Sequence, residues 1–307
     1  MGDSMKKIWK YRFLLIIVAA WAGMSALGYL NRNTVYERYE IDAKKTPYFA
    51  VVLEGIRDGI YPWSGERKPL WEIWEKIASR QESLLETETT ENPQAGTESE
   101  TETETEAFER TFTRVDQDYF DDAVFIGDSR TVGLYEYGGL DDAVFYATTG
   151  LNIYDLWTEK MCEVDGKMVT LEEALSTQTF GKIYFQIGIN EMGRGTIDGF
   201  MEAYAQTVAK FQELQPDAII FVQGIMRVTK EKSENDEIFN NEGINARNER
   251  IAELADNRSI FYIDMNEVVC DKEGNLDDSL TFDDIHLFGS KYGIWVEFLQ
   301  EHGIIVP

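Results

Sequence analysis

Five short runs of apolar, β-branched and aromatic residues recur along the C-terminal two thirds of the chain. They cover residues 123–127, 143–147, 182–188, 218–224 and 259–264. Runs this continuously apolar are typical of strands covered on both faces. Between them lie segments with helical spacing of apolar positions, at 197–214, 244–255 and 291–303. Alternating strands and helices predict an α/β fold with a parallel, doubly wound sheet in three layers, in which ligands gather beyond the carboxyl ends of the strands.

A different apolar pattern begins the chain. Residues 13–30 carry no charge and are long enough to cross a bilayer as a helix. The short tail over 1–12 is basic, through Lys6, Lys7, Lys10 and Arg12. The positive-inside bias therefore predicts a single-pass signal anchor in the cell membrane, with a cytoplasmic N-terminus and everything after Leu30 outside. A cleaved signal peptide is the alternative.

Two further segments separate this anchor from the predicted sheet. Residues 31–80 predict a membrane-proximal helical stalk, with an amphipathic helix after Thr46 and a tryptophan-rich stretch at 69–77 that suits a lipid interface, a partner or its own hairpin. Residues 81–109 hold ten Glu and no Lys or Arg. Like charges repel and little apolar surface is present, so this segment is expected to be a disordered acidic linker before a folded domain at 110–307.

The net charge limits the kinds of molecule that the chain is expected to bind. The chain has a formal charge of −27, and residues 111–307 alone contribute 15 basic and 37 acidic residues. Such a charge excludes nucleic acid as a natural partner and favours a neutral or cationic substrate, although solubility alone also explains it.

Only Cys162 and Cys270 are present, and two separate thiols are expected. No zinc-type spacing occurs, and no metal or cofactor is expected.

The stretch "VFIGDSRTVGL" at 124–134 contains the first candidate for chemistry. Ser129 follows the carboxyl end of the first predicted strand, where a nucleophile is exposed on a rigid frame. A serine at a helix start is also a common cap. The same Gly-Asp-Ser triplet occurs at residues 2–4 with no strand before it, so the triplet alone decides nothing.

A serine nucleophile needs a base, and histidine suits that task. The chain has two. His302 lies at the expected end of the last helix, where an imidazole complements the helix dipole. His286 lies between the last strand and the last helix, with Asp283 three residues before it, so one loop presents a base and an orienting carboxylate.

Two residues after neighbouring strands fit an oxyanion hole. Gly150 follows the second strand and brings a bare backbone N–H close to a substrate oxygen. Asn190 follows the third strand and offers a side-chain amide from the same rim. Each alone is an ordinary turn residue.

Together these residues resemble the SGNH subgroup of the GDSL-type serine hydrolases, over about residues 120–302 and in the family's order. The resemblance implies a flavodoxin-like α/β/α domain that performs ester chemistry. It implies Ser129 as nucleophile, His286 as general base and acid, and Asp283 as the residue that orients the imidazole. The implied oxyanion hole consists of the Ser129 N–H, the Gly150 N–H and the Asn190 amide.

The sequence departs from that pattern at two places. Glu191 stands after Asn190, where many members have Asp, and Asp284 stands where Gly is frequent. The stretch also lacks the Gly-x-Ser-x-Gly elbow of α/β-hydrolases. These changes leave the implied triad intact and put the substrate in doubt. The long polar segment at 229–243 either shapes substrate entry or is simply exposed to solvent.

The leading hypothesis is a membrane-anchored extracellular esterase that removes small acyl groups, such as acetyl, from a carbohydrate or cell-envelope substrate without a cofactor. The first alternative is an O-acyltransferase that moves the acyl group to a cell-wall sugar. The second is a non-catalytic glycan-binding scaffold that has kept the fold.

Overall fold

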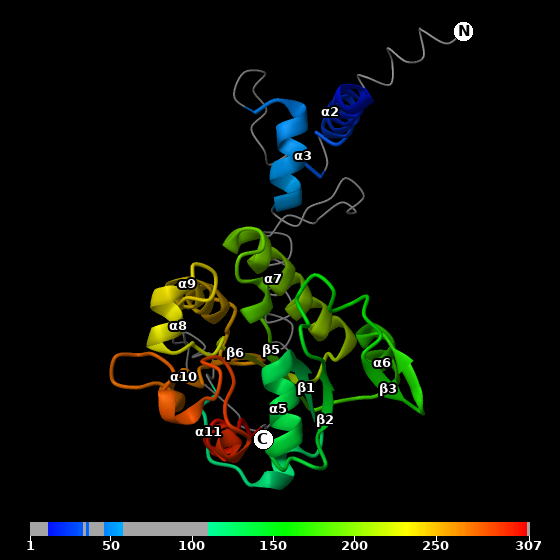
Figure 1. Ribbon diagram of the computed structural model, residues 1–307. Coiled ribbons are helices and arrows are strands. Elements are labelled where there is room, and N and C mark those ends of the chain that lie inside the picture. The colour runs from blue at the N-terminus through cyan, green and yellow to red at the C-terminus, as the bar shows by residue number, and fades with distance from the viewer. Residues whose placement is uncertain (1–11, 33–34, 37–45, 58–109, 306–307) are drawn as a thin grey trace, which may run out of the picture. The chain divides into compact units, whose positions relative to one another are not determined.

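The computed structural model describes residues 12–32, 35–36, 46–57 and 110–305 of the chain (Figure 1). The first eleven residues of the basic tail, the tryptophan-rich stretch and the acidic linker lie outside the described residues. The chain divides into two compact units, one N-terminal and one that contains the predicted sheet. Each is described by itself.

The N-terminal unit contains two helices, α2 (Arg12–Leu30) and α3 (Tyr48–Arg57). The rings of Tyr29 and Tyr48 meet edge to face with centroids 5.4 Å apart, and Val51 and Val52 on α3 are buried. The amphipathic helix predicted after Thr46 is therefore present.

The expected membrane-spanning anchor at 13–30 is not supported. Residues 13–30 are helical within α2. Among the described residues no helix is both long and apolar enough to cross a bilayer, for which about 20 residues are needed.

The second unit is built on a five-stranded sheet with the order β2-β1-β5-β6-β7, in which all strands are parallel. The strands are β1 (Ala123–Gly127), β2 (Val144–Ala147), β5 (Lys182–Gln186), β6 (Ile219–Gln223) and β7 (Ile260–Ile263). This is the flavodoxin-like order, in which the chain starts near the centre and reverses direction after the second strand. The five predicted strands are confirmed, with ends one or two residues shorter in four of them.

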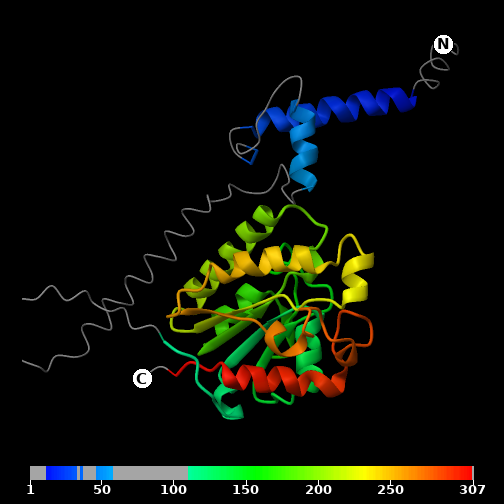
Figure 2. The same cartoon turned by 90° about the vertical axis from the view of Figure 1, so that its left-hand side faces the viewer.

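Helices cover both faces of this sheet. Figure 2 shows α7 (Ile197–Leu214) and α9 (Asn241–Ala252) on one face and α11 (Tyr292–Glu301) on the other. The helix α5 (Ser129–Tyr137) packs beside α11, where Gly133 leaves room for the Tyr292 hydroxyl. The predicted α/β/α layering is confirmed. Shorter helices lie in the connections, namely α6 (Leu171–Thr177), α8 (Lys230–Asn235) and α10 (Asn266–Val269).

A row of aromatic rings crosses the sheet on the α11 face. The rings belong to residues in direct register on the five strands, namely Phe145, Phe125, Tyr184, Phe221 and Phe261. The three pairs from Phe145 to Phe221 are stacked, with centroids 4.8, 4.6 and 4.4 Å apart. Aromatic pairs of this kind add about 0.5–1.5 kcal/mol each beyond their burial, so the row stabilises the packing of the strands that carry the candidate site.

The sequence did not predict a small antiparallel hairpin between β2 and α6. It consists of β3 (Cys162–Val164) and β4 (Lys167–Val169). Asp165 and Gly166 form its turn with φ values of 51° and 73°. An Asp-Gly pair favours this conformation, so a signal was present in the sequence.

Candidate active site

Ser129 lies where β1 ends and α5 begins. Every residue of β1 is buried, which fixes the position of the turn that follows. Gly127 is needed there because a side chain would collide with the Gln186 carbonyl and the Thr131 side chain. Asp128 then caps α5 by accepting a 3.0 Å hydrogen bond from the backbone N–H of Arg130. The capping role is therefore held by Asp128, and the half-buried Ser129 side chain is left for other contacts.

The second part of the site is the loop at 281–288, which is closed by a bridge between Thr281 and Leu287. His286 Nε2 lies 2.8 Å from Ser129 Oγ, and His286 Nδ1 lies 2.7 Å from Asp283 Oδ2. The other oxygen of Asp283 accepts the backbone N–H groups of His286 and Ile285, at 2.8 and 3.1 Å. The structure thus brings Ser129, His286 and Asp283 into one hydrogen-bonded chain.

Asp283 is held in its charged form. Partial burial by itself raises the pKa of this carboxyl, but hydrogen bonds from the backbone and ring of His286 and from the Ile285 N–H outweigh it and lower the pKa. An ionised Asp283 beside Nδ1 favours the tautomer with a proton there. Nε2 is then free to accept the hydroxyl proton of Ser129.

Arg130 fastens the loop to the serine turn. Its side chain is buried, and Nε and Nη2 donate to the Ile285 carbonyl at 3.2 and 3.1 Å. Burial lowers the pKa of Arg130 and raises that of Asp128, while each charge offsets part of the shift of the other. Sequence reasoning missed this contact, and its only signal was a basic residue directly after the candidate nucleophile.

The two predicted oxyanion residues follow the strands on either side of β1. Gly150 comes after β2 and has a φ of 80°, a backbone conformation that residues other than glycine rarely adopt. Asn190 comes after β5 and donates through Nδ2 to the Leu151 carbonyl at 2.8 Å. An amide nitrogen carries two N–H groups, so this bond orients the amide and leaves a second donor. The carboxyl ends of three adjacent parallel strands therefore carry Ser129, Gly150 and Asn190.

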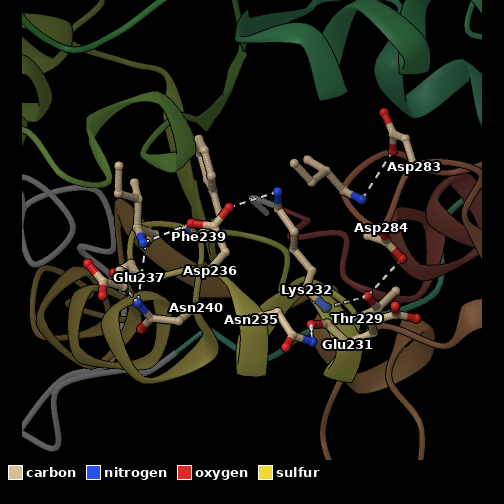
Figure 3. A network of polar contacts seen from close by, with 12 residues as sticks. Thr229, Glu231, Lys232, Asn235, Asp236, Glu237, Phe239, Asn240, Asp283 and Asp284 are labelled. Atoms are coloured by element: carbon tan, nitrogen blue, oxygen red, sulfur yellow. Dashed lines mark hydrogen bonds and ion pairs between the residues drawn. The ribbon is translucent and has the colours of Figure 1, made fainter.

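Asp284 has a φ of 72°, which lies in the left-handed region that favours glycine. Thr229 supports it through two hydrogen bonds, of which Figure 3 shows the one from the side chain. The Thr229 hydroxyl donates to Asp284 Oδ1 at 2.9 Å, and the Thr229 N–H donates to the Asp284 carbonyl at 3.1 Å. Thr229 also caps α8, because its hydroxyl oxygen accepts the Lys232 N–H at 3.2 Å. The polar segment at 229–243 thus begins with a short helix tied to the loop of His286.

An ion pair stabilises the end of α8. Lys232 Nζ lies 2.8 Å from Asp236 Oδ2, and the other Asp236 oxygen accepts the N–H groups of Ile238 and Phe239 (Figure 3). The Lys232 ammonium and these N–H groups lower the pKa of Asp236 to about 2. Asp236 therefore stays charged at neutral pH, and the segment after α8 has a defined course.

The remaining candidates lie apart from this arrangement. His302 caps the end of α11, where Nδ1 lies 2.7 Å from the Phe298 carbonyl and the ring packs on Phe112. Cys162 and Cys270 are separate free thiols. In the ranges that the structure describes, no three metal-ligating side chains come together.

No curated protein matches the sequence. Among solved structures, similar chains include a protein from Streptococcus pneumonia whose assignment as a platelet activating factor is provisional (19% identity, 75% of this chain and 95% of that one, TM-score 0.47). A second is a GDSL-like lipase from Bacteroides thetaiotaomicron, with 12% identity over 73% of this chain and 96% of that one and a TM-score of 0.44. A third is a catalytic mutant of an acetylxylan esterase from Geobacillus stearothermophilus, with 16% identity over 58% of this chain and 92% of that one and a TM-score of 0.40.

The family comparison covers the whole arrangement described above. A sequence model of the GDSL-like lipase/acylhydrolase family matches residues 125–288, which is more than half of the chain and runs from the middle of β1 to the end of the His286 loop. The chain therefore belongs to the GDSL-like lipase/acylhydrolase family and is an ester hydrolase of the SGNH type.

Proposed function

We propose that this chain is a serine esterase that cleaves small acyl groups, such as acetyl, from carbohydrate hydroxyls. The observation that carries the proposal is the continuous hydrogen-bonded chain from Ser129 through His286 to Asp283. Such a series of hydrogen bonds activates a serine without a bound cofactor.

The chemistry follows from the positions of the atoms. As Ser129 Oγ attacks the ester carbon, His286 Nε2 takes its proton and Asp283 stabilises the imidazolium that forms. The C–O bond to the alcohol then breaks, and the leaving oxygen receives the proton from Nε2. Water attacks the acyl-enzyme with His286 again as base, which releases the acid and restores Ser129.

The negative oxygen of each intermediate needs donors. The N–H groups of Ser129 and Gly150 and the second N–H of the Asn190 amide supply them in this proposal. Ser129 is also the first residue of α5, so the positive end of the helix dipole favours the same charge.

The residues near His286 favour a sugar as the alcohol part of the ester. The leaving oxygen has to lie beside His286 Nε2, and the ring of Phe282 lies next to that of His286, with centroids 6.2 Å apart and planes at 21°. Phe282 is 64% exposed, and Phe288 packs beside it with 39% exposed. On so open a surface an alkyl chain stays half in water, whereas a pyranose places its apolar C–H face on the ring and keeps its hydroxyls hydrated.

The experiment that tests the proposed function uses the purified full chain and acetyl, butyryl and octanoyl esters of one methyl glycoside, with and without free oligosaccharide acceptors. We expect release of acid without an acceptor, and a rate that falls as the acyl chain lengthens. Product that forms only with an acceptor would support transfer to a sugar instead. No turnover of any ester would contradict the proposal.

We also propose that the folded unit works outside the cytoplasm. The support is the order of charges, since the basic tail precedes the uncharged stretch at 13–30 and the acidic residues follow it. Protease added to intact cells is expected to cut within 81–109. Cutting only after lysis would contradict this location.

A further inference from the structure

Glu191 is a buried carboxyl that the mechanism above does not use. It ends the 3-10 turn Ile189–Glu191 that follows β5, and it has no exposed surface. Its Oε1 accepts a short hydrogen bond from the backbone N–H of Ile153. Its Oε2 is equally buried and has no hydrogen-bond partner among the described residues. A buried polar atom without a partner is rare and points to a role for the group that carries it.

The contact to Ile153 concerns the oxyanion hole. Asn190 holds the Leu151 carbonyl, and Glu191 holds the Ile153 N–H, so two consecutive residues grip the loop just after Gly150. The N–H of Gly150 is aimed by the backbone of this loop. A shift of the loop would therefore move one of the proposed oxyanion donors, and such donors act only at well-defined distances.

The surroundings of Glu191 do not suit a charge. The Asp128 carboxyl on the cap of α5 repels it, and the buried hydroxyl of Tyr204 on α7 lies close enough to interact with it electrostatically. Arg247 on α9 attracts it, but the Arg247 Nη1 donates to the Gly243 carbonyl and Arg247 in turn faces Tyr154. The carboxyl therefore interacts with one anion, one cation and neutral hydroxyl groups.

We propose that Glu191 is a positioning residue of the oxyanion hole, which holds the loop of Gly150 as a neutral carboxylic acid and loosens it on ionisation. Burial raises the pKa of Glu191 to about 8, with Asp128 adding to the shift. Above that pH the second oxygen carries charge where no donor meets it, so the loop is favoured to move and admit water. This inference rests on the proposed ester hydrolysis.

The test compares the full chain with Glu191→Gln and Glu191→Met in kcat and KM for a soluble acetyl ester from pH 6 to 10. The rate of spontaneous ester hydrolysis is measured in the presence of Ser129→Ala and subtracted. Gln keeps an acceptor for Ile153 and cannot ionise, whereas Met has a similar length and no such acceptor. Glu249→Gln makes the same exchange at an exposed position and is the matched control.

We expect the wild type and Glu249→Gln to lose kcat with a midpoint near pH 8, with KM nearly constant. Glu191→Gln is expected to keep kcat within about threefold at pH 7 and to lack this alkaline decline. Glu191→Met is expected to lose about 10- to 100-fold in kcat at every pH, as for a misplaced oxyanion donor.

The same alkaline decline in Glu191→Gln as in the wild type would overturn the inference, and so would a normal kcat in Glu191→Met. If Glu191→Met does not fold, as judged by circular dichroism, the profile of Glu191→Gln decides alone. A wild type without any esterase activity would overturn the proposed function and this inference with it. An active wild type with an unchanged Glu191→Gln profile overturns only the role of Glu191.

Discussion

The side chain of Thr229 donates its hydroxyl hydrogen to Asp284 at 2.9 Å. This bond joins the start of α8, which follows β6, to the loop of His286. The two residues are 55 positions apart in the sequence. Asp284 is the neighbour of Asp283, so the bond supports the loop at the point where its backbone takes a positive φ. A left-handed non-glycine residue costs roughly 1 kcal/mol or more, and contacts of this kind offset the cost.

Replacement of Thr229 is expected to weaken the folded state. Thr229→Val removes the buried hydroxyl and leaves Asp284 and the Lys232 N–H without it, so the free energy of unfolding should fall by about 1–3 kcal/mol. Thr229→Ser keeps the hydroxyl and is the control. Urea denaturation of both variants measures the difference. Equal stability of the Val and Ser variants would show that the bond contributes nothing.

The two adjacent aspartates are expected to differ in catalysis. Asp283→Asn removes the charge that orients the His286 ring, and kcat should fall by two to four orders of magnitude. Asp284→Asn keeps an oxygen for the Thr229 hydroxyl and does not touch the imidazole, so kcat should change by less than about threefold. Steady-state kinetics of both variants decide the matter. A similar loss in both would mean that the loop conformation, and not the charge on Asp283, controls the rate.

Phe282 is expected to matter only for sugar esters. Phe282→Ala should lower kcat/KM for an acetylated methyl glycoside about tenfold, the value of one aromatic contact of roughly 1.4 kcal/mol, and leave ethyl acetate unchanged. Tyr135→Ala removes another exposed ring, on α5, and serves as the control. An equal effect on both esters would argue against a sugar on this surface.

The stability of the protein is expected to depend on pH through Glu191. Burial raises its pKa in the folded state to about 8, whereas the unfolded chain ionises near the ordinary value of 4.5. The folded state therefore binds the proton more tightly. The resulting stabilisation is complete below about pH 4.5 and is lost as the pH rises toward 8, by on the order of 1 kcal/mol per pH unit.

Thermal unfolding measures this dependence. The difference in Tm between the wild type and Glu191→Gln should shift in favour of the Gln variant from pH 5 to pH 8. Parallel curves for the two proteins would show that Glu191 is ionised in the folded state at neutral pH.

Much of the site could be predicted because its residues follow from local rules. A continuous apolar run marks a strand buried on both faces, and the residue after its end lies on the rim of a parallel sheet. Ser129, Gly150 and Asn190 all come from that rule. Asp283 and His286 are three residues apart on one loop, a spacing that is visible in the sequence.

The supports of the site could not be predicted in the same way. Arg130 and Glu191 are charged residues that ordinary burial statistics place on the surface. They are buried because partners 155 and 38 positions away, the Ile285 carbonyl and the Ile153 N–H, meet their side chains. Only the folded chain brings these atoms together. The helix α8 was missed for a related reason, since its sequence is polar throughout and its cap contacts the distant Asp284.

Labelling of the full chain with a fluorophosphonate, which reacts with an activated serine, tests directly whether Ser129 is the nucleophile. We expect one label per chain, on Ser129, in the wild type and in His302→Ala. We expect no label in Ser129→Ala and a very slow reaction in His286→Ala, with ester turnover lost in both. Labelling of the wild type at another residue, or equal losses of turnover in His286→Ala and His302→Ala, would contradict the roles of Ser129 as nucleophile and His286 as its base.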